Sequence, residues 1–172
     1  QGRNPASTAR PSGCRHRQSM GRGRIRRRDQ RATLNASAQD GGGRTLTFNL
    51  LITNVDDHLQ NHGFLHVAHG QWRLAPAFDI NPFPDKDRES KTWLSEQDGP
   101  ITDVHMLLAR APYFALNREQ ALSVLQEVYV AVCRWRQVAL SPEVGLQANE
   151  LDDFAPAFEH GEMEASAALL GL

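Results

Sequence analysis

The chain of 172 residues contains few cysteines and no long apolar run. Its two cysteines, Cys14 and Cys133, lack the close spacing of metal ligands, which argues against a zinc knuckle or a disulfide framework. No apolar stretch approaches the roughly 20 residues that cross a bilayer, and the start lacks the apolar core of a secretory signal. We therefore expect a cytoplasmic protein that makes no contact with a membrane.

Lysine is also scarce, and the charge is unevenly distributed. Residues 1–44 contain 11 arginines and two acids, whereas residues 45–172 contain 18 acids and 8 basic residues. The net charge of −1 therefore conceals a first segment of +9 and a second of −10. The composition predicts two parts with different properties that meet near residue 45.

Residues 1–44 have no aromatic side chain, and Met20, Ile25 and Leu34 are their only larger apolar residues. Such a segment buries too little apolar surface to offset the entropy of ordering, so we expect it to be disordered. Two alternatives stay open. The arginines between Arg22 and Arg31 could form an arm for nucleic acid, although no aromatic residues for base stacking accompany them, and we expect no direct nucleic-acid binding. Alternatively, a GC-rich gene translated in the wrong frame yields this composition. A chain that begins with Gln1 also suggests a fragment.

The pattern changes at residue 45. The apolar residues at 46, 48, 50 and 52 alternate as in a strand, yet those at 46, 50 and 51 also fit one face of a helix. A polar loop follows at residues 54–63. Two short apolar runs on either side of His69 and Gly70 then predict a β-hairpin, which leads into a second loop at residues 75–82. Two acid-bearing loops are thus joined by one hairpin.

This order suits phosphoryl transfer, which needs a carboxylate to accept a hydroxyl proton and oxygen ligands for Mg²⁺. Protein kinases space the first acid and an asparagine as Asp-x-x-x-x-Asn and place a second acid beyond a hairpin. Asp56 and Asn61 have this spacing. Asp79 follows the hairpin and is preceded by Phe78. The ordered set predicts a kinase-like site.

Two other interpretations of the first loop remain open. Asp56 and Asp57 could simply cap a turn or a helix. His58 and His62, four residues apart, could bind zinc together with Asp56, Asp57 or His66 in a metal-dependent hydrolase, although Gly63 interrupts any helix that would align them. A structural role for His58, bracing the loop backbone, is the simpler expectation.

The string TNVDDHLQNHGFL at residues 53–65, followed by WRLAPAFDINPFP at residues 72–84, resembles the C-terminal lobe of HipA-like serine/threonine kinases. These kinases are the toxins of bacterial toxin–antitoxin modules. The resemblance continues more loosely to about Glu159, through VCRWRQVA at residues 132–139 and FAPAF at residues 154–158. It covers roughly two thirds of the chain.

The resemblance implies a mainly α fold with a small β-hairpin, in which residues 45–53 are helical. It implies that Asp56 is the catalytic aspartate and that Asn61 and Asp79 bind Mg²⁺, with Asp57 and His58 in support. ATP would donate its γ-phosphate to a serine or threonine hydroxyl of a protein, such as an aminoacyl-tRNA synthetase. A helix-turn-helix antitoxin would be the partner.

The remaining residues predict packing elements. We expect residues 45–160 to form the lobe and residues 161–172 a flexible tail. Thr102 is expected to cap a short helix, and Ser141-Pro142 to begin another. Asn117 and Gln120 predict a capping box that opens a long helix, with a buried stripe formed by Leu122, Leu125, Val128, Val132 and Trp135.

The sequence shows no nucleotide-binding lobe. Its glycine-rich run at residues 41–43 is followed by Arg44 rather than lysine, and its two lysines, Lys86 and Lys91, both come after Asp79. We therefore expect a catalytic lobe that is incomplete and inactive alone. The alternative is a non-catalytic remnant that binds the antitoxin.

Overall fold

The computed structural model describes residues 41–68, 71–84 and 90–172. Six α-helices and a two-stranded antiparallel hairpin account for most of the regular structure in these ranges, which confirms the expected mainly α class. The expectations for residues 1–40, including the basic arm, lie outside the described residues. No helix within these ranges is both long enough and apolar enough for a membrane crossing.

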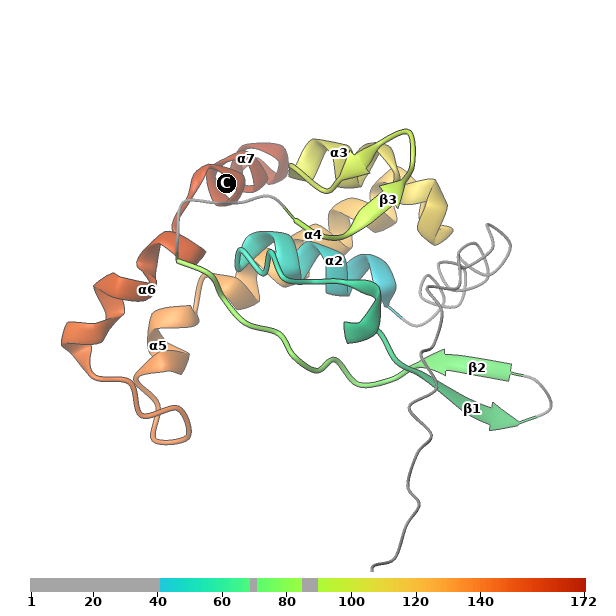
Figure 1. The fold of residues 1–172 in the computed structure, drawn as a ribbon. Helices are drawn as coiled ribbons and strands as arrows, with labels where there is room; N and C mark the ends of the chain where they lie inside the picture. Colours follow the sequence, from blue (N-terminus) through green and yellow to red (C-terminus); the bar gives the residue numbers. More distant parts are fainter. Residues whose placement is uncertain (1–40, 69–70, 85–89) are drawn as a thin grey trace, which may run out of the picture.

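Helix α2 (Gly42–Leu51) lies at the centre of the fold (Figure 1). The run that was ambiguous between strand and helix is helical because Leu46, Leu51 and Ile52 are all buried. The helix packs against α4 (Arg118–Val132) and also touches α3 (Val104–Ala109) and α7 (Gly161–Leu170). It begins at Gly42, a few residues before the boundary that charge placed at residue 45.

Helix α4 has the predicted capping box. The Asn117 side chain accepts a hydrogen bond from the Gln120 amide at 2.8 Å, and Gln120 Oε1 accepts from the Asn117 amide at 2.9 Å. Within the helix, Leu125, Val128 and Val132 are buried against Leu51 and Ile52. The predicted stripe is therefore the main core face, although Trp135 belongs to the separate helix α5 (Trp135–Ala139).

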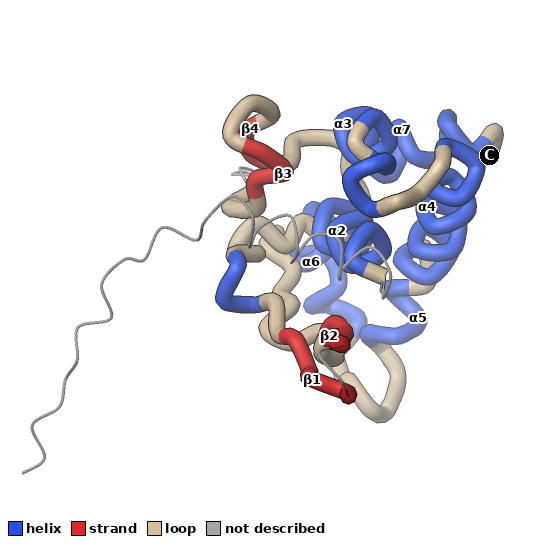
Figure 2. The backbone as a smooth tube through the Cα atoms, turned by 90° about the vertical axis from the view of Figure 1, so that its right-hand side faces the viewer, coloured by secondary structure: helices blue, strands red, loops and turns tan. Residues whose placement is uncertain are grey.

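The predicted hairpin is formed by β1 (Phe64–Ala68) and β2 (Gln71–Leu74), which pair antiparallel with Phe64 opposite Leu74. It projects from the helical body beside the 3₁₀ turn η1 (Leu59–Asn61) (Figure 2). A second small sheet was not expected. It pairs β3 (Trp93–Ser95) with β4 (Gly99–Pro100) through a turn at residues 96–98, and Gly99 directly after the turn has a φ of 77°.

Two expected helix starts differ in the structure. Asp103, not Thr102, caps α3 by accepting from the Met106 amide at 2.7 Å, and the Thr102 hydroxyl donates to the Asp103 carboxylate instead. The chain from Ser141 forms a turn rather than a helix, and Gly145, with φ of 74°, redirects it. Pro112 lies in the 3₁₀ turn η2 (Ala111–Phe114).

Helix α5 packs against α6 (Leu151–Phe158), which follows the 3₁₀ turn η3 (Ala148–Glu150). The Trp135 and Phe158 rings stack with centroids 4.6 Å apart and planes 8° from parallel. The two stretches that carry the looser part of the resemblance therefore pack on each other. Beside them, an apolar cavity of about 460 Å³ opens between α2, α4, α5 and α6.

Residues 161–172, for which we expected a flexible tail, form α7 up to Leu170. Met163, Leu169 and Leu170 pack on the cluster that contains Leu51 and Leu125, and Ser166 is fully buried.

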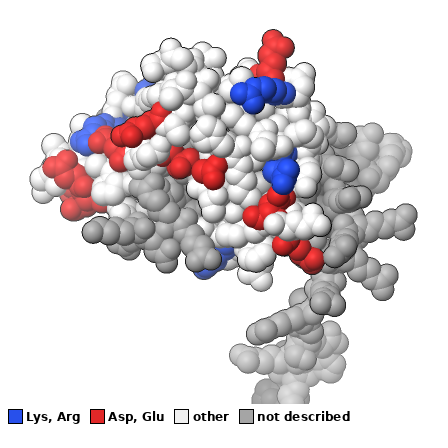
Figure 3. All heavy atoms as spheres, turned by 90° about the horizontal axis from the view of Figure 1, so that it is seen from above, with Lys and Arg blue, Asp and Glu red and all other residues white. Residues whose placement is uncertain are grey.

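The face of the molecule that is seen from above carries more acidic than basic side chains (Figure 3), consistent with the negative charge of residues 45–172.

Candidate active site

The loop at residues 54–63 begins where α2 ends. Thr53 adopts a left-handed backbone with φ of 54°, and its hydroxyl donates to the carbonyl of Ala157 in α6 at 3.0 Å. The Asn54 amide donates back to the Asn49 carbonyl at 2.8 Å, and the two side chains also bond at 3.2 Å. These contacts reverse the chain sharply and tie the start of the loop to two helices.

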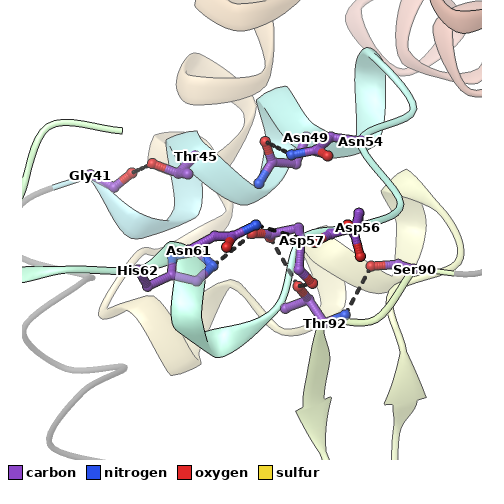
Figure 4. A network of polar contacts seen from close by, with 10 residues as sticks. All are labelled: Gly41, Thr45, Asn49, Asn54, Asp56, Asp57, Asn61, His62, Ser90 and Thr92. Atoms are coloured by element: carbon purple, nitrogen blue, oxygen red, sulfur yellow. Dashed lines mark hydrogen bonds and ion pairs between the residues drawn. The ribbon is translucent and has the colours of Figure 1, made fainter. Parts of the chain in front are cut away.

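The loop brings the Asn61 side chain against the backbone of Asp56. Asn61 Nδ2 donates to the backbone carbonyl of Asp56 at 3.2 Å (Figure 4). The Asn61 backbone amide donates to the His58 carbonyl at 2.8 Å. The side-chain bond uses the amide nitrogen of Asn61. It does not engage Oδ1, the atom that would bind a metal ion.

The carboxylate of Asp56 is half exposed and forms an ion pair with Lys91. The hydrogen bond from Lys91 holds the pKa of Asp56 below its ordinary value, since its effect outweighs the smaller opposing effect of desolvation. Asp56 is therefore ionised at neutral pH. An ionised, solvent-accessible carboxylate is able to accept a proton from a bound hydroxyl.

Asp57 points the other way, into the protein, and is only 2% exposed. His62 Nε2 lies 2.9 Å from one of its carboxylate oxygens, and the Thr92 hydroxyl donates to the other at 2.9 Å (Figure 4). Burial raises the pKa of Asp57, but hydrogen bonds from His62, Thr92 and Asn49 together lower it below its ordinary value. Asp57 thus anchors the loop that carries Asp56.

The histidines are not arranged as the zinc alternative requires. His62 pairs with Asp57. His58 and His62 flank the 3₁₀ turn η1 and therefore do not share one face of an α-helix. His66 lies on strand β1. Among the residues that the structure describes, no three His, Cys, Asp or Glu side chains gather where they could hold a metal ion.

The segment that carries Asp79 packs against this loop. The Ala75 amide donates to the Gly63 carbonyl at 2.7 Å, and the Phe83 amide donates to the Thr53 carbonyl at 3.2 Å. The Phe78 ring lies so close to Gly63 that a Cβ there would come within 3.3 Å of it. The structure thus places the two acid-bearing loops side by side.

Asp79 itself has a left-handed backbone with φ of 55°, and its Oδ1 accepts from Asn81 Nδ2 at 3.0 Å. Aspartate tolerates this conformation better than most residues, but it still costs free energy relative to glycine. Backbone strain of this kind concentrates at functional sites. The described residues show no direct bond between Asp79 and either Asp56 or Asn61.

The strain at Asp79 predicts an unusual stability effect. Asp79→Gly and Asp79→Ala both lose the carboxylate, but only glycine relieves the backbone. We expect the glycine variant to be more stable than the alanine variant by about 1 kcal/mol, measured by urea unfolding. Equal stabilities would mean that the conformation at Asp79 costs nothing.

Three further residues shape the site without having been predicted: Lys91, Thr92 and Asn49. Lys91 and Thr92 lie 35 residues from their partners Asp56 and Asp57, so no local spacing reveals them. The only signal was the scarcity of lysine, which makes each one notable. Asn49 lies on α2 directly under the loop and bonds to Asn54.

The structure is a mainly helical domain with one hairpin between two acid-bearing loops. Comparison of the sequence with models of known protein families identifies a domain of this kind. Residues 23–135, more than half of the chain, match the model of the HipA-like C-terminal domain. The chain belongs to this family. The matched region begins well before the boundary expected at residue 45. No curated protein and no solved structure matches the chain.

Proposed function

We propose that the chain is the catalytic lobe of a HipA-like serine/threonine kinase. The observation that carries this proposal is the loop in which Asn61 closes back onto Asp56 while the strained Asp79 segment packs alongside. Asp56 would accept the proton of the attacking hydroxyl. More specifically, the kinase would be the toxin of a toxin–antitoxin module, because residues 53–65 and 72–84 resemble the HipA-like kinases of such modules.

Asn61 and Asp79 have the oxygen donors that Mg²⁺ prefers, and Asn61 Oδ1 is not used by the bond to Asp56. Together they would hold the ion. Mg²⁺ bound to ATP neutralises charge on the β- and γ-phosphates during transfer. Asp57, through His62 and Thr92, would hold the loop so that Asp56 stays at the position where the hydroxyl arrives.

ATP would need further contacts besides those of Asn61 and Asp79. A protein hydroxyl, for example on an aminoacyl-tRNA synthetase, would be the acceptor, and a helix-turn-helix antitoxin the restraining partner, both as the family resemblance implies. We expect phosphate transfer by the chain alone to be slow, because few groups stabilise the transferring phosphoryl. Binding is therefore the primary test.

Calorimetric titration of the purified chain with ATP, with and without Mg²⁺, tests the proposal. We expect Mg²⁺-dependent binding that Asp79→Asn weakens about tenfold or more, because a charged ligand is lost. Asp56→Asn should retain binding but abolish any transfer of labelled γ-phosphate. The control Asp153→Asn removes an exposed acid of α6 and should change neither.

The remnant alternative gives a different result. A chain that binds no ATP in the presence of Mg²⁺, or whose Asp79→Asn variant binds as well as the wild type, would contradict the kinase proposal. Retained binding of a helix-turn-helix antitoxin in that case would favour a non-catalytic binding module. Stoichiometric zinc that is lost in His58→Ala and His62→Ala would instead favour the hydrolase.

A further inference from the structure

A short segment at residues 90–92, which we call the strap, runs alongside residues 55–57. The Lys91 amide donates to the Val55 carbonyl at 3.1 Å. The Thr92 hydroxyl bonds to both the backbone carbonyl of Asp57, at 2.5 Å, and its carboxylate, at 2.9 Å (Figure 4). Backbone and side-chain bonds thus fix the register between two segments that lie 35 residues apart.

This register gives Lys91 and Thr92 different partners. Thr92 bonds to the buried Asp57, whereas the ammonium of Lys91 pairs with Asp56 at the surface. The side chains of Lys91 and Asp56 are 62% and 44% exposed. An ion pair this exposed contributes little net stability, because water and salt screen it, so the ammonium can exchange Asp56 for another anion at little cost. Its backbone stays fixed while its side chain is free to turn.

A phosphoryl-transfer site needs such a cation. Negative charge spreads over the γ-phosphate oxygens during transfer, and a positioned cation in contact with them lowers the barrier. Within the described ranges, Lys91 is the cation that touches the proposed proton acceptor. The attacking hydroxyl must bridge Asp56 and the γ-phosphorus, so a cation beside Asp56 also lies beside the phosphate.

We propose that Lys91 is the phosphate-binding residue of this site, which pairs with Asp56 in the free protein and binds the γ-phosphate oxygens once ATP is present. The inference rests on the proposed kinase function and deepens it. In the transfer, the substrate oxygen forms a bond to the γ-phosphorus, and the bond from that phosphorus to the β-bridging oxygen breaks. The electron pair leaves with ADP, and the hydroxyl proton passes to Asp56. Lys91 stays protonated throughout.

The exchange would also affect Asp56. In the free protein the Lys91 hydrogen bond occupies a carboxylate oxygen of Asp56. Once Lys91 turns to the phosphate, that oxygen is released for the substrate hydroxyl. The same movement would therefore stabilise the phosphate and prepare the proton acceptor.

The test compares Mg²⁺-ATP with Mg²⁺-ADP, which lacks the γ-phosphate, as ligands of the full chain. We expect Lys91→Gln to weaken Mg²⁺-ATP binding about tenfold and to leave Mg²⁺-ADP binding unchanged, because only ATP offers the γ-phosphate. Lys91→Arg should retain most of the preference for ATP. The control Arg118→Gln removes an exposed cation at the start of α4 and should change neither affinity.

Thermal melting of each variant shows whether the fold is intact, since Lys91→Gln loses only an exposed ion pair and should melt close to the wild type. If Lys91→Gln binds Mg²⁺-ATP like the wild type, or weakens ATP and ADP binding equally, Lys91 does not bind the γ-phosphate. In that case Mg²⁺-ATP binding that depends on Asp79 would leave the kinase proposal standing. If the wild type binds no Mg²⁺-ATP at all, both proposals fail.

Discussion

Replacing Asp57 with alanine should lower the free energy of unfolding by about 3 kcal/mol and the melting temperature by roughly 10 °C. The carboxylate is buried and accepts hydrogen bonds from His62 and Thr92, so its removal leaves the His62 ring without this partner and leaves the Thr92 hydroxyl with the backbone carbonyl of residue 57 alone. Circular dichroism during heating measures the loss. Asp153→Ala, on the exposed side of α6, is the matched control and should melt with the wild type.

The same carboxylate predicts how stability depends on pH. Because the pKa of Asp57 is lower in the folded protein than its ordinary value of 3.8, its contribution is fully present above pH 4 or so and is lost as the pH falls through the folded pKa. Urea unfolding at pH 7, 5 and 3 should show the wild type converging on Asp57→Asn in acid. A constant difference between the two proteins would mean that the charge of Asp57 contributes nothing.

Deleting residues 160–172 should have an even larger effect. The deletion removes Met163, Leu169 and Leu170 from the main core cluster, and it exposes Leu51, which is fully buried at the end of α2. It also removes the Glu162 carboxylate that accepts from the Val104 amide at 2.8 Å. We expect a loss of about 4 kcal/mol or more from the lost apolar burial alone, which is a large share of the roughly 5–15 kcal/mol that stabilises a typical native protein.

The shortened chain should therefore melt without a sharp transition and expose apolar surface to a hydrophobic dye. Deleting only Gly171 and Leu172 is the control, because Leu172 is 71% exposed and contributes little burial. A chain without α7 that still melted cooperatively near the wild-type temperature would show that the helix is an accessory rather than part of the core.

The parts of the structure that the sequence predicted are those that local chemistry determines. The Asn117 and Gln120 capping box needs only a spacing of three residues, and the buried stripe of α4 needs only its own periodicity. The hairpin is likewise local. Each of these features forms within about ten residues of chain, so the pattern of residues suffices.

The features that were missed depend on contacts between distant residues. Lys91 reaches Asp56 only because the strap returns beside the first loop. Helix α7 was underestimated because Glu162 and Glu164 beside small residues promise little apolar burial, whereas small side chains such as Ser166 allow it to pack closely within the fold. The helix expected from Ser141 was wrong for a local reason. Proline there suits a helix start, but Gly145, with its positive φ, redirects the chain before a helix can form.

The bond between Thr53 and Ala157 has a consequence for how the protein is made. Thr53 starts the candidate active-site loop, and its hydroxyl partner lies 104 residues later in the chain. His160 similarly contacts the carbonyl of Leu51, at the end of α2, from 109 residues away. At a translation rate of ~5–20 residues per second, Thr53 is synthesised roughly 5–20 s before its partner. During that interval the loop lacks both of these contacts, so its observed geometry is complete only after α6 and α7 have been synthesised and have docked.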